Sequence, residues 1–411
     1  MGITELNLDL TDEQKALRDS SRKFFMEVWR PAAIALDKMP RPEDVVAQGS
    51  IFWDVLKKTY ELGYHRMGFP QLVGGMELDP LSMALVTEAM GYASPGLAVA
   101  WGVCTTPYNY ALLSTDPAVQ GWTVSFLQDT QAKMTGCWAI TEPDHGSDWL
   151  LLDDQMSSNP ACSPQVRATL QGDEYVINGQ KAAWVSMGTV ASHAALFVNL
   201  DPTKGPGAGG IAAIPLDLPG ISRGKPLDKI GQRDLNQGEI FFDNVRIPKS
   251  MMVVADPEMY KVMIDMQLTG ANGWMGVCFT GCAHSAYDEA LNYAKQRVQG
   301  GKPIIEHQNI KLKLFEMFTA IEASRSLSRR SMIYNSTQAK ALLPGVLEYA
   351  IASKIFGTET AFRTASQAIQ IFGGNGLSRE YVIEKIFRDA RAALIEDGVN
   401  ETLALGGATR L

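Results

Sequence analysis

The spacing of apolar residues changes its period twice along the chain, and this double change limits the fold more than any other feature. Up to about residue 133, apolar side chains recur every three to four residues, as in amphipathic helices. Residues 134–250 carry short apolar runs separated by Gly, Pro and Asn, and helical spacing returns from Met251. We expect an α+β protein with an N-terminal helical domain (1–133), a middle β-barrel or sandwich domain (134–250) and a C-terminal four-helix bundle (251–411).

The N-terminal part carries local helix signals. Thr11 and Gln14, with two acidic residues between them, form a capping-box pattern that predicts a helix start. A second helix is expected from Pro80 to Met90, and the segment from Gly96 to Val103 is apolar enough to be fully buried.

The middle part carries short strand-like runs. The expected strands include Thr135–Ile140, Tyr175–Ile177, Ala194–Val198, Gly210–Ile214 and Glu239–Phe242. Asn178-Gly179 follows one of these runs, and we expect a turn there because this dipeptide favours tight hairpins.

The C-terminal part contains long amphipathic segments, and its end holds an acidic pair. The expected bundle helices are Asp265–Gln296, Gln308–Asn335, Leu343–Ile371 and Arg379–Leu394. We expect the last helix to stop at Gly398, which would leave Glu396 and Asp397 in its final turn. Carboxylates there oppose the helix macrodipole, so the pair is either solvated or retained for chemistry.

Composition excludes several classes of protein. The net charge of −8 argues against a nucleic-acid partner, which requires a basic surface. There is no uncharged apolar run of 18 residues, so we expect no membrane span, and the N-terminus has no secretory pattern. The five cysteines are scattered and no histidine has metal-like spacing, so we expect reduced thiols in a cytoplasmic protein without a metal site.

Several segments could bind a ligand, although each alone could equally be an ordinary loop or a buried side chain. Thr141–Asp148 follows a predicted strand and offers hydroxyls and backbone N–H groups. Trp184 and Ser186 place an indole near a hydroxyl, which suits the edge of a planar cofactor. Gln370–Gly376 is a Gly-rich break without a preceding strand, so it is no dinucleotide fingerprint, and Arg297 could reach a phosphate.

Taken in this order, the segments resemble the acyl-CoA dehydrogenase family of flavoproteins over nearly the whole chain. The motifs that carry the resemblance are Thr141–Asp148, Trp184–Ser186, Asp228–Arg233, Val245–Pro248, and Gln370–Gly376 leading into Glu384-Lys385 and Arg388–Ala390. The family has the domain order predicted above and usually forms homotetramers. The resemblance therefore implies an oxidoreductase acting on CH–CH groups, with FAD, an acyl-CoA substrate and an electron-transfer flavoprotein as electron acceptor.

The resemblance also implies which residues hold FAD between the β domain and the bundle. Cofactor-binding positions are matched by Trp138, Ile140, Thr141, Ser147, Trp184, Ser186 and Asn400. Ser186 would hydrogen-bond near the flavin N5. Positions that hold the FAD of a neighbouring subunit are matched by Arg297, Gln299, Gln308, Gln370, Gly373 and Gly374. An obligate oligomer is therefore expected.

Asp397 falls where most of the family carry a glutamate base, nine residues beyond Arg388. In the family this base removes the α-proton of the thioester while the β-hydride passes to flavin N5. Such a carboxylate needs a water-poor pocket that raises its pKa toward neutrality. Substrate-binding positions of the family are matched by Ser147, Asn272 and Gly398.

The chain also departs from the family pattern. Asp397 is one methylene shorter than glutamate, and a displacement of about 1 Å can cost about a hundredfold in rate. Glu396 stands where the family usually has an aromatic residue and is a rival base. Ala271 occupies an earlier position of the base in some members and cannot serve, Asn272 replaces an arginine, and Gly300 replaces a phenylalanine. These changes suggest an unusual acyl group that is cyclic, branched or aryl-bearing.

Other functions remain open from the sequence. The same fold could perform oxidative decarboxylation or desulfination of an acyl-CoA. Nitroalkane oxidase, a relative, uses an aspartate at this position, but the place of its supporting arginine is here Ala404. A non-catalytic CoA-binding protein is also conceivable, although the retained flavin-side motifs and the carboxylate argue against it.

Overall fold

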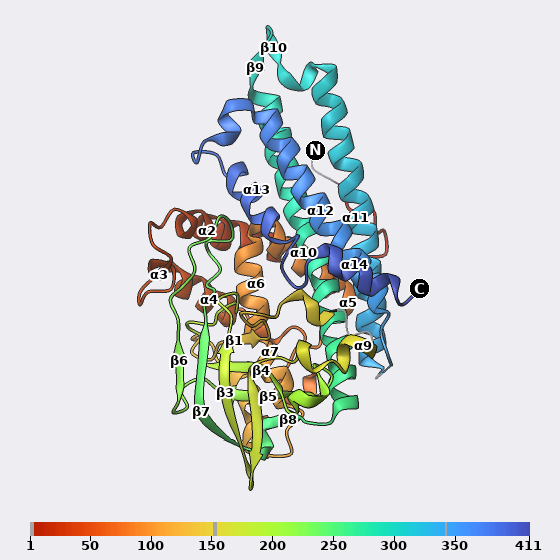
Figure 1. Cartoon of the computed structure of the whole chain (residues 1–411). Helices are drawn as coiled ribbons and strands as arrows, with labels where there is room; N and C mark the ends of the chain where they lie inside the picture. Colours follow the sequence, from red (N-terminus) through yellow and green to blue (C-terminus); the bar gives the residue numbers. More distant parts are fainter. Residues whose placement is uncertain (1–3, 151–153, 342) are drawn as a thin grey trace.

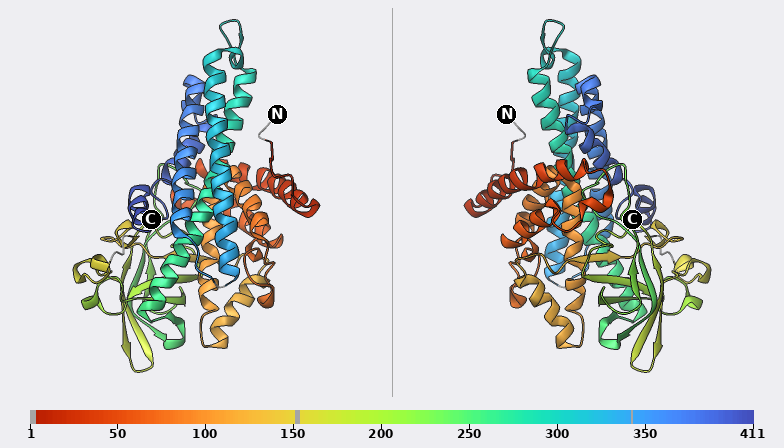
Figure 2. Two further views of the ribbon diagram at one scale, coloured as in Figure 1. Left: turned by 90° about the vertical axis from the view of Figure 1, so that its right-hand side faces the viewer. Right: turned by 90° about the vertical axis from the view of Figure 1, so that its left-hand side faces the viewer.

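The structure is a computed structural model that describes residues 4–150, 154–341 and 343–411. The long C-terminal helices form the axis of the molecule, with the N-terminal helices on one side and the sheet on the other (Figures 1 and 2). This arrangement confirms the predicted fold of helices, a β domain and a helical bundle.

The N-terminal helices form a layer with a largely buried inner part. They are α1 (Asp12–Phe24), α2 (Arg30–Asp37), α3 (Pro42–Val45), α4 (Ile51–Glu61), α5 (Pro80–Ala93), α6 (Pro95–Cys104), α7 (Thr106–Ala111) and α8 (Pro117–Gln128). The capping box is confirmed, since Thr11 Oγ1 accepts the Gln14 N–H and the Gln14 side chain accepts the Thr11 N–H, each at 3.1 Å. Almost every side chain of α6 is buried, as its composition predicts.

The middle domain is a twisted sheet. Its strands are β1 (Gly136–Ala139), β2 (Arg167–Gln171), β3 (Glu174–Lys181), β4 (His193–Asn199), β5 (Gly209–Pro215), β6 (Ile221–Arg223), β7 (Ile240–Pro248) and β8 (Met252–Val254), with the short helix α9 (Asp154–Ser157) before β2. The hydrogen-bonded order is β6-β7-β3-β2-β4-β5-β8, and β1 pairs with β4 in parallel. Strands β4 and β5 are buried almost throughout, so they form the centre of the domain core.

The turn predicted at Asn178-Gly179 was wrong. Both residues lie inside β3, where the register with β7 shifts between Ile177 and Gly179. Gly179 has φ 132°, and a Cβ there would lie 2.8 Å from the Val166 backbone, so the glycine serves a β-bulge and not a hairpin. The hairpin between β2 and β3 instead turns at Gly172, which has φ 65°.

The C-terminal domain contains long helices that pass close to one another. They are α10 (Pro257–Gln296), α11 (Gln308–Lys340), α12 (Leu347–Phe372), α13 (Ile383–Ala392) and α14 (Asn400–Ala408), with a hairpin of β9 (Val298–Gln299) and β10 (Lys302–Pro303) at the tip. Glycines permit the closest approach, because a Cβ at Gly276 of α10 would lie 2.1 Å from the Ser353 hydroxyl of α12. Among the described helices, none has the length and apolarity needed to cross a membrane.

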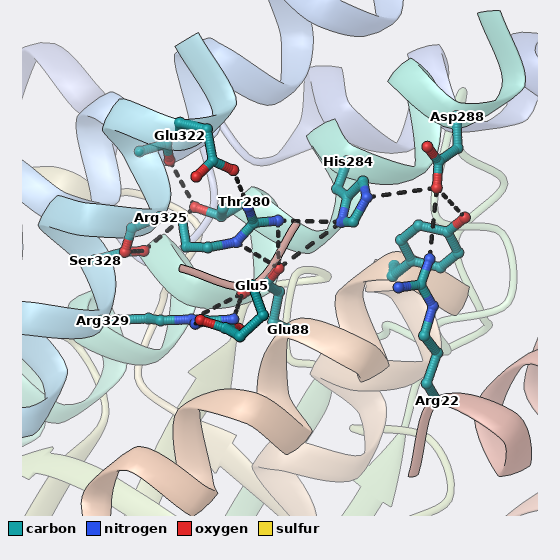
Figure 3. A network of polar contacts seen from close by, with 12 residues as sticks. Glu5, Arg22, Glu88, Thr280, His284, Asp288, Glu322, Arg325, Ser328 and Arg329 are labelled. Carbon is teal, nitrogen blue, oxygen red and sulfur yellow. Dashed lines mark hydrogen bonds and ion pairs between the residues drawn. The ribbon is translucent and has the colours of Figure 1, made fainter. Parts of the chain in front are cut away.

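A buried ionic network ties the N-terminal layer to the bundle (Figure 3). The Glu88 carboxylate of α5 accepts from the guanidinium groups of Arg325 and Arg329 of α11, each through two nitrogens at 2.8–3.1 Å. Arg329 also donates to Glu5 at 2.8 Å. Burial raises the pKa of Glu88, but the two guanidinium groups outweigh this effect and hold the pKa well below its usual range. The carboxylate is therefore ionised at neutral pH.

We expect Glu88→Gln to lower the free energy of unfolding by about 3–5 kcal/mol, because two buried guanidinium groups would lose their counter-charge. Since the pKa of Glu88 is lowered by folding, the loss should be full at neutral pH and should fade as the pH falls through the folded pKa. Urea-induced unfolding measures both effects. As the control, Glu359→Gln breaks an exposed ion pair with Arg363 and should change stability by no more than about 0.5 kcal/mol. Equal effects of the two substitutions would contradict the prediction.

Candidate active site

The ends of β1 and β3 bring the two predicted ligand-binding segments together. The Ala182 N–H donates to the Thr141 carbonyl at 2.9 Å, so the chain after β1 lies beside the chain after β3. Beneath them, the fully buried Lys181 ammonium donates to the Ile140 carbonyl at 2.9 Å and to the Glu142 carboxylate at 2.7 Å. Burial lowers the pKa of Lys181 to about 8, while Glu142 opposes this shift. This buried pair fixes the floor of the site.

The exposed surface above this floor suits a planar ring. Trp184 lies in the turn after β3 and is 59% exposed, although a large apolar indole is usually mostly buried. Close by, the Ser186 hydroxyl accepts from Gln237 at 3.2 Å, and Gln237 accepts from the Lys229 ammonium at 2.8 Å. Burial lowers the pKa of Lys229 to about 8, and the nearby Glu396 carboxylate raises it in part. The structure thus places the segment that follows β1 beside the segment that follows β3, which carries Trp184 and Ser186.

The chain around Asp397 forms a turn and not the end of a helix, so the expected helix stop at Gly398 was wrong. Helix α13 already ends at Ala392, and α14 begins at Asn400. Asp397 and Gly398 both have left-handed backbones, with φ 50° and 98°. A Cβ at Gly398 would lie 2.4 Å from Leu150 Cδ1, so only glycine fits. The carboxylates therefore precede a helix N-terminus, where the macrodipole favours negative charge.

Lys354 of α12 holds this turn from below. Its ammonium group, completely buried, donates to the Gly398 carbonyl and to Asn400 Oδ1, each at 2.7 Å. Burial lowers the pKa of Lys354 to about 8, and the Asp397 carboxylate opposes this shift. Lys354 was not among the predicted residues. The signal that marks it is a lysine within the apolar face of a helix, next to Ile351.

Two more hydrogen bonds hold the turn that carries Asp397. Asn400 donates from Nδ2 to Thr358 Oγ1 of α12 at 3.1 Å, and the Val399 N–H donates to Ser147 Oγ at 2.9 Å. Ser147 and Asn400, which were expected to contact the cofactor, thus have structural partners: Ser147 binds Val399 of the turn, and Asn400 binds α12. Their contacts with FAD, and those of Ser147 and Gly398 with substrate, stay predictions.

The two adjacent carboxylates point to different surroundings. Asp397 lines an internal pocket, whereas Glu396 accepts from Gln232 Nε2 at 2.7 Å and does not line it. Burial raises the pKa of Asp397, and the charge of Lys354 lowers it in part. Burial also raises the pKa of Glu396 to about 7, with a further contribution from the Asp397 charge. Asp397 therefore faces the space in which a ligand can bind.

The pocket beside Asp397 has a volume of about 250 Å³ and is rich in aromatic side chains. Three indoles line it, from α6, β1 and α10: Trp101, Trp138 and Trp274. Gly270 and Ala271 of α10 add little bulk to the wall, and His65 and Phe69 line it from the N-terminal layer. Among the described lining residues, only Trp138, Ala271 and Asp397 were singled out from the sequence as site positions. The others belong to elements far apart in the chain.

Asn272 does not share this pocket. Its side chain is fully buried and its Nδ2 donates to the Leu268 carbonyl at 2.9 Å, one turn back on α10. Its neighbour Ala271 lines the pocket instead. A direct contact between Asn272 and substrate therefore stays a prediction.

A second cavity, of about 690 Å³, lies near the β9–β10 hairpin, at the end of the bundle away from the sheet (Figure 1). It is lined by five of the predicted residues: Arg297, Gln299, Gln370, Gly373 and Gly374. Gln308 is the first residue of α11 but does not line the cavity; its neighbours His307 and Asn309 do, and neither was predicted. The predicted cofactor residues thus form two separate groups within one chain.

Both groups fit a flavin nucleotide. The first offers an exposed indole beside a hydroxyl, which suits a planar ring. The second offers a guanidinium, side-chain amides and two glycines, and a Cβ at Gly373 or Gly374 would meet no atom within 4 Å. A guanidinium beside open glycine backbone suits a pyrophosphate.

Family models and relatives match the sequence over most of its length. The N-terminal, middle and C-terminal domains of acyl-CoA dehydrogenases match residues 11–115, 137–245 and 262–411. A probable acyl-CoA dehydrogenase of Bacillus subtilis, YngJ, is 31% identical over 400 residues, covering 96% of this chain and 97% of the relative. A cyclohex-1-ene-1-carbonyl-CoA dehydrogenase of Geobacter metallireducens is 29% identical over 406 residues, covering 95% of this chain and 96% of the relative.

Solved structures show the same fold. Butyryl-CoA dehydrogenase from Megasphaera elsdenii superimposes with a TM-score of 0.84 at 26% identity, covering 98% of this chain and 99% of that one. A glutaryl-CoA dehydrogenase, at 24% identity, superimposes with a TM-score of 0.83. The match covers 97% of this chain and 95% of that one. The chain therefore belongs to the acyl-CoA dehydrogenase family, whose members are FAD-dependent oxidoreductases.

Proposed function

We propose that this enzyme forms an α,β-double bond in the acyl group of a CoA thioester, with Asp397 as the base. The observation that carries the proposal is the position of Asp397, which lines a pocket rich in aromatic side chains while its turn is held by Lys354. Proton abstraction from a carbon acid needs a desolvated carboxylate whose pKa is raised toward neutrality. Burial raises the pKa of Asp397 in this direction.

Each part of the chain has one task in this reaction. The indoles exclude water and hold the acyl group, while Asp397 takes the α-proton. Lys354 fixes the turn, so the shorter side chain is held at a defined distance from the substrate. When bound, FAD supplies the acceptor for the β-hydrogen, and Trp184 and Ser186 hold its ring while Arg297, Gln299 and Gln370 of a neighbouring subunit hold its phosphates.

Glu396 is the less suitable base. Its carboxylate is engaged by Gln232 at 2.7 Å and lies outside the pocket lining. A base must come within hydrogen-bond reach of the proton that it removes. We infer that Glu396 influences the charge around Asp397 and does not take the proton itself.

The pocket lining supports a compact acyl group with a ring. Gly270 and Ala271 leave room beside three indoles, which offer flat apolar faces. The relative from Geobacter metallireducens is named for a cyclic acyl group, which agrees with this interpretation. We propose a cyclic, branched or aryl-bearing thioester as substrate, a homotetramer as the assembly and an electron-transfer flavoprotein as the acceptor. We also propose that the boundaries between the three domains lie near residues 133 and 250.

Anaerobic bleaching of the bound flavin tests the activity. We expect cyclohexanecarbonyl-CoA, or an arylpropionyl-CoA, to bleach the flavin faster than any straight-chain thioester in the same panel. Fast bleaching by straight-chain thioesters alone would reject the proposed substrate class but keep the reaction. Failure of every thioester would reject the reaction.

Asp397→Asn should keep FAD and the fold but slow bleaching by about 10²–10⁴-fold, because it removes the general base. Glu396→Gln is the matched control at the next residue and should retain most of the rate. Stopped-flow absorbance measures both rates. The assignment is wrong if the Glu396 variant is the slow one.

Lys354→Met should move the acid limb of the pH–kcat/KM profile to higher pH. The Lys354 charge lowers the pKa of Asp397, so its removal raises that pKa, and the deprotonated base then forms only at higher pH. Thr358→Val is the control, because it loosens the same turn through Asn400 without removing a charge. The limb should stay in place in that variant. A shift of the acid limb in both variants would indicate that Lys354 has a purely structural role.

Arg297→Ala should weaken FAD retention and assembly together, since the guanidinium lines the cavity at the β9–β10 end. Flavin absorbance and size-exclusion chromatography measure the two properties. Arg246→Ala removes an exposed guanidinium on the sheet and should change neither. A flavinated, intact assembly of the Arg297 variant would contradict the role of this cavity.

A further inference from the structure

His65 separates the pocket beside Asp397 from a second cavity on the N-terminal side. Within the described part of the chain, it is the one residue that lines both spaces. The second cavity has a volume of about 310 Å³ and is lined by Tyr60, Arg66, Gln128 and Thr130 among others. A single side chain thus lies between the aromatic pocket beside Asp397 and the cavity beside Tyr60.

The imidazole is held firmly in this place. It is 2% exposed and stacks on the Tyr60 ring, with centroids 4.3 Å apart and planes at 12°. The Phe126 ring meets it edge-on at 5.2 Å, and Nε2 lies 3.3 Å from the Leu127 carbonyl. Burial lowers the pKa of His65 to about 4, so the ring is neutral at physiological pH and can face an apolar group.

His65 and Asp397 enter the pocket from different parts of the molecule. His65 follows α4 and packs against α4 and α8, whereas Asp397 belongs to the turn before α14 (Figure 1). The residues that hold Asp397 come from α12 and from the loop after β1, and none of them contacts His65 among the described interactions. His65 and Asp397 therefore line the same pocket from separate elements that do not share hydrogen-bond partners.

We propose that His65 is a specificity-determining residue that sets the maximum length of the acyl group. The inference rests on the proposed thioester chemistry at Asp397. A cavity of about 150 Å³ can hold a benzene ring. The pocket of about 250 Å³ therefore holds one ring with a short linker and stops at the imidazole. Without the imidazole, the acyl tail could continue into the cavity beside Tyr60.

The test compares kcat/KM for palmitoyl-CoA and for the best compact thioester in three forms of the holoenzyme. In the wild type, palmitoyl-CoA should be the poorer substrate. In His65→Ala, the ratio of palmitoyl-CoA to compact thioester should rise by at least about tenfold, because each excluded methylene is worth about 10–200-fold in a hydrophobic pocket. His65→Phe keeps a ring on Tyr60 and should keep the wild-type ratio.

Several outcomes would overturn the inference. Equal kcat/KM for palmitoyl-CoA and the compact thioester in the wild type would show that there is no wall, and this measurement needs no variant. An unchanged ratio in a flavin-replete His65→Ala enzyme would show that the wall lies elsewhere. A raised ratio in His65→Phe as well would assign the effect to general loosening. In each case, bleaching by the compact thioester would leave the proposed function intact, whereas its absence would reject that function first.

Discussion

The ammonium group of Lys354 joins the bundle to the turn that carries Asp397, and the site depends on this contact for both shape and charge. Without it, the Gly398 carbonyl and the Asn400 side chain would lose a buried donor, and the left-handed turn would lose its anchor. The same cation moderates the effect of burial on the Asp397 pKa. α12 can place this amine so deeply because small residues such as Gly276 and Ser353 let α10 and α12 approach closely.

Much of the fold could be predicted because its signals are local. The capping box at Thr11 and the short apolar runs of the β domain act within a few residues, and the structure confirms them. The errors arose where a distant contact overrode a local preference. Asn178-Gly179 favours a hairpin, but the pairing of β3 with β7 continues through it as a bulge. Gly398 looks like a helix stop, yet α13 ends earlier because the turn is held from α12 and from Ser147.

The site could be predicted only in part, for a related reason. Trp184 and the Thr141–Asp148 segment lie in recognisable motifs, so their proximity to each other follows from the resemblance. The acyl pocket has no such motif, because Trp101, Trp274 and His65 come from separate elements whose packing brings them together. Lys354 is marked in the sequence only as a charged residue on an apolar helix face. Its partner, the Gly398 carbonyl, can be identified only from the three-dimensional position of the turn.

The groups around Asp397 also make ligand binding a proton-exchange event. Glu396, Lys354 and Lys229 have pKa values of about 7, 8 and 8, so each is part-titrated near neutral pH. An acyl group that displaces water beside Asp397 raises the pKa of that carboxylate, and the change in its charge shifts the proton occupancy of Glu396 and Lys354, which interact with it electrostatically. The calorimetric heat of binding a thioester will therefore depend on the ionisation enthalpy of the buffer. The slope of binding heat against buffer ionisation enthalpy will give the number of protons that the site releases or takes up.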